Sequence, residues 1–437
     1  MTAADLRSFA HPLYDTEGDH KPLLELIGDS RFVLLGEGSH GTHDFYHERA
    51  EITKRLIIEK GFNAVAVEAD WPDAFRVNRY VRGEGDDSDG NSALSGFQRF
   101  PTWMWRNTVV LEFVEWLRNA NSSRTEKTKT GFYGLDLYSL FNSMAMVVSY
   151  LDQVDAEAAR RARYRYSCFE QFGEDSQAYG YAASFDLSRS CEDEAVKQLV
   201  ELQRRGMAYL SETDGASFFD AEQNARLVKN AEEYYRSMFR GRQSSWNLRD
   251  THMVETVEAL AAYLSRQGQV PKVVIWAHNS HLGDARATEM GERGELNVGQ
   301  LIRQEYGSDA VLVGFTTYDG TVTAATNWDD PGEVKRVRPA LPDSYELGFH
   351  ETQIPRFFLD LERDTITSPL FSRPRLERAI GVIYRPETER VSHYFRADLP
   401  GQFDAVFHFD HTRALEPLEK PEQWHHTELP ETFPSGI

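Results

Sequence analysis

Five histidine and glutamate side chains follow three short apolar segments of the sequence. The segments are 31–35, 65–67 and 273–277. The polar side chains after them are Glu37, His40, Glu68, His278 and His281. Carboxylates and imidazoles serve proteins as general acids and bases, and imidazole is suited to removing a proton from water near pH 7. These residue types therefore indicate an enzyme that moves protons.

The apolar segments must position these side chains. A short, continuously apolar segment is typical of a strand that is buried on both faces. In an open α/β sheet, ligands bind outside the carboxyl ends of the strands. We therefore expect three strands of one sheet to deliver the five side chains to one edge.

The helix expected after the first strand contributes a charged residue to its apolar stripe. The positions of the stripe are Phe45, Arg49, Ile52 and Leu56, a spacing that places them on one helix face. A buried guanidinium needs a carboxylate or an anionic ligand. If the strands before Glu37 and Glu68 are neighbours, Arg49 would hold both carboxylates ionised.

The sequence predicts an α/β fold with a mostly parallel sheet flanked by helices. Strand and helix patterns alternate over the first 137 residues, which is typical of parallel strands with right-handed crossovers. The first strand is expected at about 31–37, and the second is expected to end at Glu68. Further strands are expected at 131–136, 272–280, 310–317, 378–384 and 404–409. Helices are expected at about 44–60 and 108–120, and another is expected to begin at Pro72. Loops are expected at 83–100, 332–355 and 365–375.

A helical lobe interrupts the expected sheet. Strand patterns vanish after about Ser139, and segments rich in Ala, Glu and Arg with helical periodicity dominate as far as Gln267. We therefore expect residues 1–138 to form the first part of the α/β core, 139–267 a helical insert, and 268–437 the second part of the core.

The composition and the net charge of the chain limit the classes of partner that it is expected to bind. The formal net charge is −21, whereas nucleic-acid binding needs clustered Lys and Arg. We expect neither nucleic acid nor a membrane as a partner, because the N-terminus lacks a signal-peptide pattern and no apolar run is long enough to span a bilayer. Two cysteines, Cys168 and Cys191, are too few for a disulfide framework or a thiolate zinc site. The cytoplasm is the expected location, and the sequence does not predict the oligomeric state.

The glycine-rich segment also matches a dinucleotide-binding pattern. Gly36, Gly38 and Gly41 have the G-x-G-x-x-G spacing between an expected strand and a helix. However, Glu37 would place a carboxylate beside a pyrophosphate, and the acidic residue that the fingerprint expects about 20 positions further on is instead Glu68, 27 positions after Gly41. The pattern also leaves the two later histidines unexplained. We therefore favour an acid–base site.

Several blocks of this sequence together resemble the erythromycin esterase family, in the same order and with similar spacing. The blocks are Gly36-Glu37-Gly38-Ser39-His40, Arg49, Val67-Glu68, Gly134-Leu135-Asp136, Trp246-Asn247-Leu248-Arg249-Asp250, Ala277-His278-Asn279-Ser280-His281, Gly381-Val382-Ile383-Tyr384-Arg385-Pro386 and Ser392-His393-Tyr394-Phe395. The Arg385–Phe395 stretch is more similar to an uncharacterised branch of the family than to its macrolide-resistance enzymes.

The resemblance implies a metal-independent hydrolase of esters or lactones. Its catalytic base would be His40, supported by Glu37, Arg49, Glu68, His278 and His281. The small-molecule substrate would occupy a cleft between the core and the helical lobe. The residues expected to contact the substrate are Trp71, Asp136, Arg249 and His393. No cofactor is implied.

Two other classes of function remain open from the residues alone. Mixed histidine and carboxylate sets bind divalent cations such as zinc or manganese, so a metal-dependent hydrolase would use His40, Glu68, His278 and His281, with Glu37, as ligands. A non-catalytic small-molecule binding protein on the same scaffold is the other alternative, because fold does not imply function.

Overall fold

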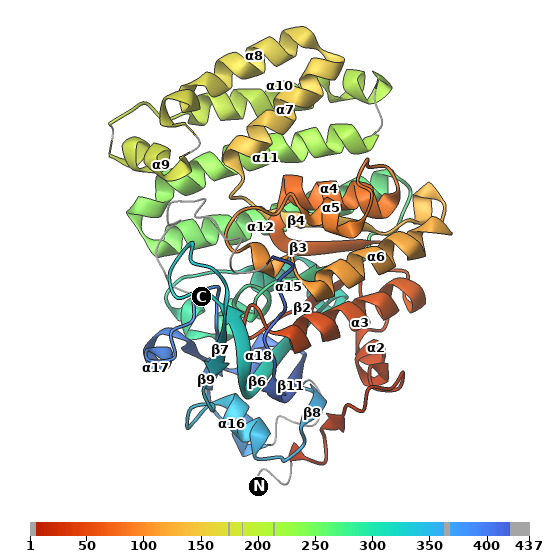
Figure 1. Cartoon of the computed structure of the whole chain (residues 1–437), viewed down its shortest axis with the longest axis vertical. Coiled ribbons are helices and arrows are strands. Elements are labelled where there is room, and N and C mark those ends of the chain that lie inside the picture. The colour runs from red at the N-terminus through yellow and green to blue at the C-terminus, as the bar shows by residue number, and fades with distance from the viewer. Residues whose placement is uncertain (1–5, 174, 186, 213–214, 362–367, 420–437) are drawn as a thin grey trace.

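The computed structural model describes residues 6–419 except 174, 186, 213–214 and 362–367. Figure 1 shows two regions along the long axis: a sheet with flanking helices, and above it a group of helices without strands. The predicted α/β class, with a central sheet flanked by helices, is confirmed. The division into three domain segments stays a prediction.

Nine strands of the described residues form the main sheet. They are β1 (His11–Pro12), β2 (Phe32–Leu35), β3 (Ala64–Asp70), β4 (Gly131–Asp136), β5 (Val273–Trp276), β6 (Ala310–Ala324), β7 (Glu333–Val337), β8 (Arg356–Asp360) and β11 (Ala405–Thr412). Their order is β1-β8-β11-β6-β2-β5-β3-β4, with β7 paired to β6. β9 (Arg375–Arg378) and β10 (Tyr394–Ala397) pair separately.

The centre of the sheet is parallel. β2 pairs with β5 and β6, and β3 pairs with β4 and β5, all in parallel register. Every residue of β2, β3, β4 and β5 is buried, as expected for strands covered on both faces. β7 and β8 pair antiparallel to their neighbours. The carboxyl ends of the central strands consequently meet at one edge.

Helices lie on the faces of the sheet and in the lobe. In the first part of the chain they are α2 (Lys21–Ile27), α3 (His43–Glu59), α4 (Trp71–Arg82), α5 (Gly90–Leu94) and α6 (Thr108–Ser122). Between β4 and β5 they are α7 (Leu140–Val154), α8 (Ala156–Tyr166), α9 (Ser176–Ser184), α10 (Glu192–Glu212), α11 (Gly215–Ser237) and α12 (Arg242–Arg266). The remaining α-helices are α13 (Asn279–Leu282), α14 (Glu289–Glu292), α15 (Val298–Tyr306), α16 (Tyr345–His350), α17 (Glu389–Ser392) and α18 (Leu399–Gln402).

Short 3₁₀ turns complete the list of helical elements. They are η1 (Thr102–Met104), η2 (Glu126–Thr128), η3 (Ser167–Phe172), η4 (Met238–Arg240), η5 (Ala285–Ala287), η6 (Gly307–Asp309) and η8 (Pro369–Phe371). A single disulfide between Cys168 and Cys191 joins η3 to the start of α10. Among the described helices, none is both long and apolar enough to cross a membrane.

Three predictions about elements in the chain were wrong. Residues 379–384 form only single bridges instead of the expected strand, Ser39 with Ile380 and Ala325 with Ile383, while Arg378 ends β9. The expected loop at 332–355 contains β7 and α16, and the expected loop at 83–100 contains α5. β7 carries no apolar alternation that a sequence pattern would reveal, because it is an exposed strand added to the end of the long β6.

One hydrophobic cluster runs from the sheet into the lobe. It contains Phe32 of β2 and Ile275 of β5 together with Phe219 and Leu227 of α11. A second cluster covers the opposite face of the sheet, against α3, α4 and α6.

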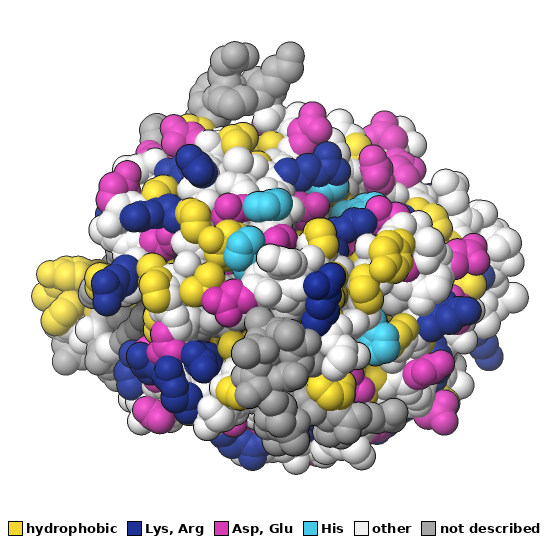
Figure 2. Space-filling model, turned by 90° about the horizontal axis from the view of Figure 1, so that it is seen from below, with side chains coloured by type: hydrophobic (Ala, Val, Ile, Leu, Met, Phe, Trp, Pro, Cys, Tyr) yellow, Lys and Arg dark blue, Asp and Glu magenta, His cyan; other side chains and the backbone are white. Residues whose placement is uncertain are grey.

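Figure 2 shows that basic and acidic side chains are interspersed on the face seen from below.

Candidate active site

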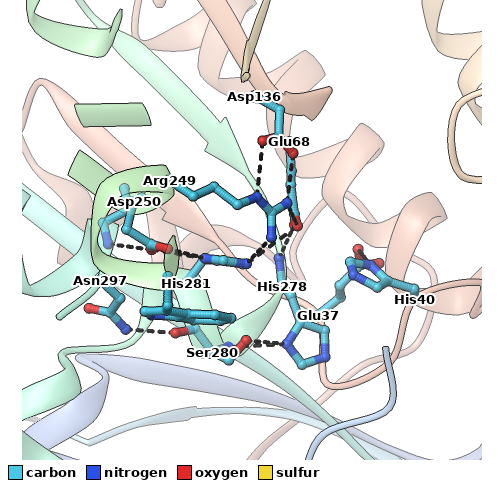
Figure 3. Close-up of polar contacts among 12 residues, drawn as sticks. Glu37, His40, Glu68, Asp136, Arg249, Asp250, His278, Ser280, His281 and Asn297 are labelled. Carbon is cyan, nitrogen blue, oxygen red and sulfur yellow. Dashed lines mark hydrogen bonds and ion pairs between the residues drawn. The ribbon is translucent and has the colours of Figure 1, made fainter. Parts of the chain in front are cut away.

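The loops after β2 and β5, the end of β3, and α12 meet at the carboxyl edge of the sheet (Figure 3). The five residues predicted from the sequence lie there, and all five side chains are buried. The sequence prediction therefore located the edge correctly, although it assumed that β2 and β3 are neighbours. β5 lies between them.

Glu37 orients His40. Its Oε1 lies 2.8 Å from Nδ1 of His40, and its Oε2 accepts a 2.9 Å hydrogen bond from Nη2 of Arg49. A carboxylate beside Nδ1 places the ring proton there, which leaves the lone pair of Nε2 free. Among the described residues, none forms a hydrogen bond with Nε2 of His40. This nitrogen is therefore available to take a proton from water.

The glycines of the first block have a packing role. A Cβ at Gly36 would lie 2.2 Å from Oδ1 of Asn279, and a Cβ at Gly38 would lie 2.6 Å from the carbonyl oxygen of Phe315. Gly41 has φ +70°, and its Cβ would lie 2.0 Å from the carbonyl oxygen of Thr323. Close backbone approach thus explains the spacing that resembles a dinucleotide fingerprint.

Glu68 is held by Arg249 instead of Arg49. Nη2 of Arg249 donates to Oε1 of Glu68 at 2.8 Å and to Oδ2 of Asp136 at 2.6 Å, while its Nε donates to Oδ1 of Asp136 at 3.0 Å. Burial raises the pKa of Glu68, but the charges of His281, His40 and Arg249 outweigh burial and hold the pKa below its ordinary value. The expected sharing of Arg49 between both carboxylates is corrected, because Arg49 pairs with Glu37.

The hydrogen bonds of His278 define its tautomer. The backbone N–H of Ser280 donates to Nδ1 of His278 at 3.2 Å, and the Ser280 hydroxyl lies 2.8 Å from the same atom. Since a backbone N–H only donates, Nδ1 carries the lone pair and Nε2 carries the proton. Burial and the charge of His40 lower the pKa of His278 well below its ordinary value, so the ring is neutral.

His278 consequently offers a buried donor to the site. Its Nε2 is buried and forms no hydrogen bond of standard geometry among the described residues, although the backbone of Gly38 interacts with the ring and raises its pKa. Its ring lies 4.9 Å from the ring of His40, centre to centre. An unpaired buried N–H is unfavourable unless a ligand satisfies it. This N–H therefore suits an oxygen atom of a substrate.

His281 is enclosed by four neighbours. Its Nδ1 lies 2.8 Å from Oδ1 of Asp250, and its ring stacks on Trp246 with 4.4 Å between centres. On the other side, its Nε2 lies 3.2 Å from Nη1 of Arg249 and 3.4 Å from Oε1 of Glu68. Burial lowers the pKa of His281, but Asp250 and Glu68 raise it more, so the net shift is upward.

Asp250 and Trp246 were not among the predicted site residues. They lie on α12 at spacings of three and four residues, so that Trp246, Arg249 and Asp250 share one helix face. The helical spacing of Trp246, Arg249 and Asp250 in the sequence was the signal that could have revealed the two missed residues. Asp136, a predicted substrate contact, anchors Arg249, and a substrate role for it remains a prediction.

Two predicted substrate contacts lie outside this constellation. Trp71 stacks on Phe75 and Tyr133 and donates from Nε1 to Asp220 of α11 at 2.8 Å. His393 packs against Tyr384 and accepts at Nε2 from the backbone N–H of Arg385 at 3.4 Å. The described contacts of both residues are with the protein interior, and a substrate role for either remains a prediction.

The two carboxylates among the proposed metal ligands are already paired with arginines. Glu37 pairs with Arg49 and Glu68 pairs with Arg249. Two guanidinium groups beside the carboxylates oppose the approach of a divalent cation. Within the described part of the chain, no group of three or more His, Cys, Asp or Glu residues is arranged to hold a metal ion. The donor set therefore does not fit a metal centre.

The erythromycin esterase profile matches residues 57–412. The chain belongs to the erythromycin esterase family. Glu37, His40 and Arg49 precede the matched range, so the geometry described above carries the argument for them. The family supports a hydrolase acting on esters or lactones.

Named relatives cover most of the chain. Erythromycin esterase type II of Escherichia coli is 25% identical over 86% of this chain and 94% of its own length. The putative hydrolase YbfO of Bacillus subtilis is 21% identical over 92% of this chain and 89% of its own length. The chain is therefore similar both to an erythromycin esterase and to a putative hydrolase.

Solved structures show the same fold. A protein from Bacillus cereus aligns with a TM-score of 0.79 and 20% identity, covering 96% of this chain and 98% of its own. A mutant of the erythromycin esterase EreC in its open conformation aligns with a TM-score of 0.63 and 17% identity, covering 91% and 94%. At these identities the likeness concerns the fold.

Proposed function

We propose that this protein hydrolyses an ester or lactone without a metal, with His40 as the general base that activates water. The observation that carries the proposal is the chain of contacts from Arg49 through Glu37 to Nδ1 of His40, which leaves Nε2 of His40 unpartnered. The same arrangement of carboxylate and imidazole activates nucleophiles in hydrolases of unrelated fold.

The proposed reaction begins at Nε2 of His40. This atom takes a proton from water as the water oxygen attacks the ester carbonyl carbon. Glu37 stabilises the resulting imidazolium, because its carboxylate accepts from Nδ1. When the tetrahedral intermediate collapses, the bond to the alcohol oxygen breaks and Nε2 returns the proton to that oxygen. The acid and the alcohol then leave.

The N–H at Nε2 of His278 is the proposed donor to the carbonyl oxygen. The carbonyl oxygen becomes negative as water attacks, and a preorganised donor in a water-poor site lowers the barrier. Its position beside the ring of His40 supports this role. We place the substrate where α12 meets the sheet edge, between the core and the helical lobe.

The test is hydrolysis of 4-nitrophenyl acetate by the wild-type protein and by His40→Asn. Loss of a positioned base reduces the rate by about 10²–10⁴, so we expect kcat to fall by that factor while the melting temperature changes little. Hydrolysis by His40→Asn at a rate near that of the wild type would overturn the assignment.

A matched control is His20→Asn. His20 is also buried and also contacts a glutamate, with Nε2 2.5 Å from Oε1 of Glu48. It lies in the N-terminal segment before β2, outside the site. We expect this variant to retain the activity of the wild type, which separates loss of the base from loss of any buried histidine–glutamate pair.

A further inference from the structure

The site contains a second carboxylate–histidine pair, formed by Asp250 and His281. Both pairs place a carboxylate oxygen 2.8 Å from Nδ1 of the ring. They differ at the other ring nitrogen. Nε2 of His40 has no partner among the described residues, whereas Nε2 of His281 lies between a guanidinium and a carboxylate (Figure 3).

Of the three nitrogens of the Arg249 guanidinium, Nη1 is the one that faces a histidine instead of a carboxylate. Nε and Nη2 donate to the carboxylates of Asp136 and Glu68. Nη1 lies 3.2 Å from Nε2 of His281. A guanidinium nitrogen can only donate, so this contact is a hydrogen bond only while Nε2 of His281 carries a lone pair.

Protonation of His281 therefore changes the contact. When solvent delivers a proton to Nε2, a new N–H bond forms there and the lone pair that accepted from Nη1 is used. The new N–H faces Oε1 of Glu68 at 3.4 Å and donates to it. Nη1 of Arg249 then retains a donor without its histidine acceptor, at the carboxyl edge of the sheet where the substrate is expected.

We propose that Asp250 is a positioning residue that holds His281 between Arg249 and Glu68, so that a proton on His281 frees Nη1 of Arg249 to donate to the substrate. The proposal rests on the proposed ester hydrolysis, to which Nη1 would add a second donor for the carbonyl oxygen beside His278. The active form is then the one with His281 protonated and His40 neutral.

The surroundings of His281 favour that form. Asp250 and Glu68 are the negative groups that face it, from α12 and β3, while Arg249 and His278 are the other titratable neighbours. Asp250 is fully buried and also accepts from the backbone N–H of Val298 at 3.1 Å, which fixes its position. The stacked ring of Trp246 attracts a cation through its face.

The test is the pH profile of kcat/KM for 4-nitrophenyl acetate. We expect a profile with an alkaline limb, which reports deprotonation of His281. Asp250→Asn removes a negative charge beside His281, which lowers its pKa, so the alkaline limb should move to lower pH by about half a unit or more. Asp250→Glu should restore the limb toward its original position.

Asp410→Asn is the matched control. Asp410 is a buried aspartate that contacts Nδ1 of His350 at 2.9 Å and Nε2 of His408 at 3.3 Å, outside the site. The alkaline limb of the Asp410→Asn variant should stay at the pH of the wild-type limb. A limb that does not move in Asp250→Asn, with activity lowered equally at every pH, would assign Asp250 a merely structural role and overturn the proposal.

An NMR titration keeps the proposal testable if a variant fails to fold. The ring Cε1–H signal of His281 in the wild-type protein, assigned by its absence in His281→Asn, should titrate above the ordinary histidine range. Titration below that range would overturn the proposal. If the wild-type protein hydrolyses no ester, the proposed function fails, while this titration still decides whether Asp250 and Glu68 hold a proton on His281.

Discussion

Nη2 of Arg49 donates to Oε2 of Glu37 at 2.9 Å, and solvent reaches neither side chain. The guanidinium also lies over the ring of Tyr46, 4.4 Å from its centre. Glu37 of this ion pair also contacts Nδ1 of His40. The ion pair holds Glu37 in the orientation that His40 requires.

Arg49→Met should destabilise the protein strongly. Removal of one partner of a buried ion pair leaves an uncompensated charge, which typically costs about 3–5 kcal/mol. The free energy of unfolding in urea measures this loss. The double variant Glu37→Gln, Arg49→Met should recover part of the stability, because no buried carboxylate remains unpaired, while hydrolysis stays low.

Arg31→Met provides the comparison for Arg49. Arg31 and Asp309 are partly exposed, with 36% and 31% of their side chains accessible. An exposed pair contributes about 1 kcal/mol or less. Equal losses for Arg31→Met and Arg49→Met would contradict the view that burial makes the Arg49 pair decisive.

Asp220→Asn should make the protein more stable at neutral pH. Burial raises the pKa of Asp220 to about 7, against the smaller opposing effects of Trp71, Arg79 and Asn224. Between about pH 4 and 7 the unfolded chain has released this proton while the folded chain retains it, so stability falls as the pH rises through this window. An asparagine does not titrate, and its Oδ1 still accepts from Trp71.

The gain from Asp220→Asn depends on pH. We expect the difference in unfolding free energy between the variant and the wild type to increase from pH 5 to pH 8 by about 1 kcal/mol or more. Urea unfolding at both values measures it. A constant difference would show that Asp220 is ionised throughout, and the Trp71 contact would then carry a full charge.

Prolonged chelation should leave activity and melting temperature unchanged. A bound metal stabilises the folded state by mass action, so its removal lowers the melting temperature. The measurements are thermal unfolding and ester hydrolysis before and after dialysis against EDTA. Activity that is lost on dialysis and restored by one added cation would establish the metal-dependent alternative.

Erythromycin should be opened weakly or not at all, while small activated esters are hydrolysed. Discrimination between substrates depends on the walls of the pocket, not on the catalytic groups. The helical lobe and the loops near 83–105 and 320–375 would form those walls. Mass spectrometry of erythromycin incubated with the protein should show no product that has gained one water.

The catalytic edge could be predicted from the sequence because its signals are local. An apolar strand followed directly by Glu37, Glu68 or His278 is visible in one window of residues, and parallel strands necessarily bring their carboxyl ends together. The stripe that buries Arg49 is equally local, since helical periodicity alone places it toward the sheet.

The partners of these residues required the tertiary structure. The insertion of β5 between β2 and β3 separates Glu37 from Glu68, and no local pattern encodes strand order. Arg249 and Asp250 reach the edge because α12 packs across it, more than a hundred residues after β4 begins. The same long-range packing turns Trp71 toward Asp220.

The sequence by itself thus determined which side chains the strands bring to the sheet edge, and the tertiary structure decided which residues of α12 join them and how they all pair. Residue type and strand position depend on neighbours along the chain, whereas hydrogen-bond partners depend on which elements pack together. For that reason the sequence identified His40 and His281, but the fold alone assigned Glu37 to the first and Asp250 to the second.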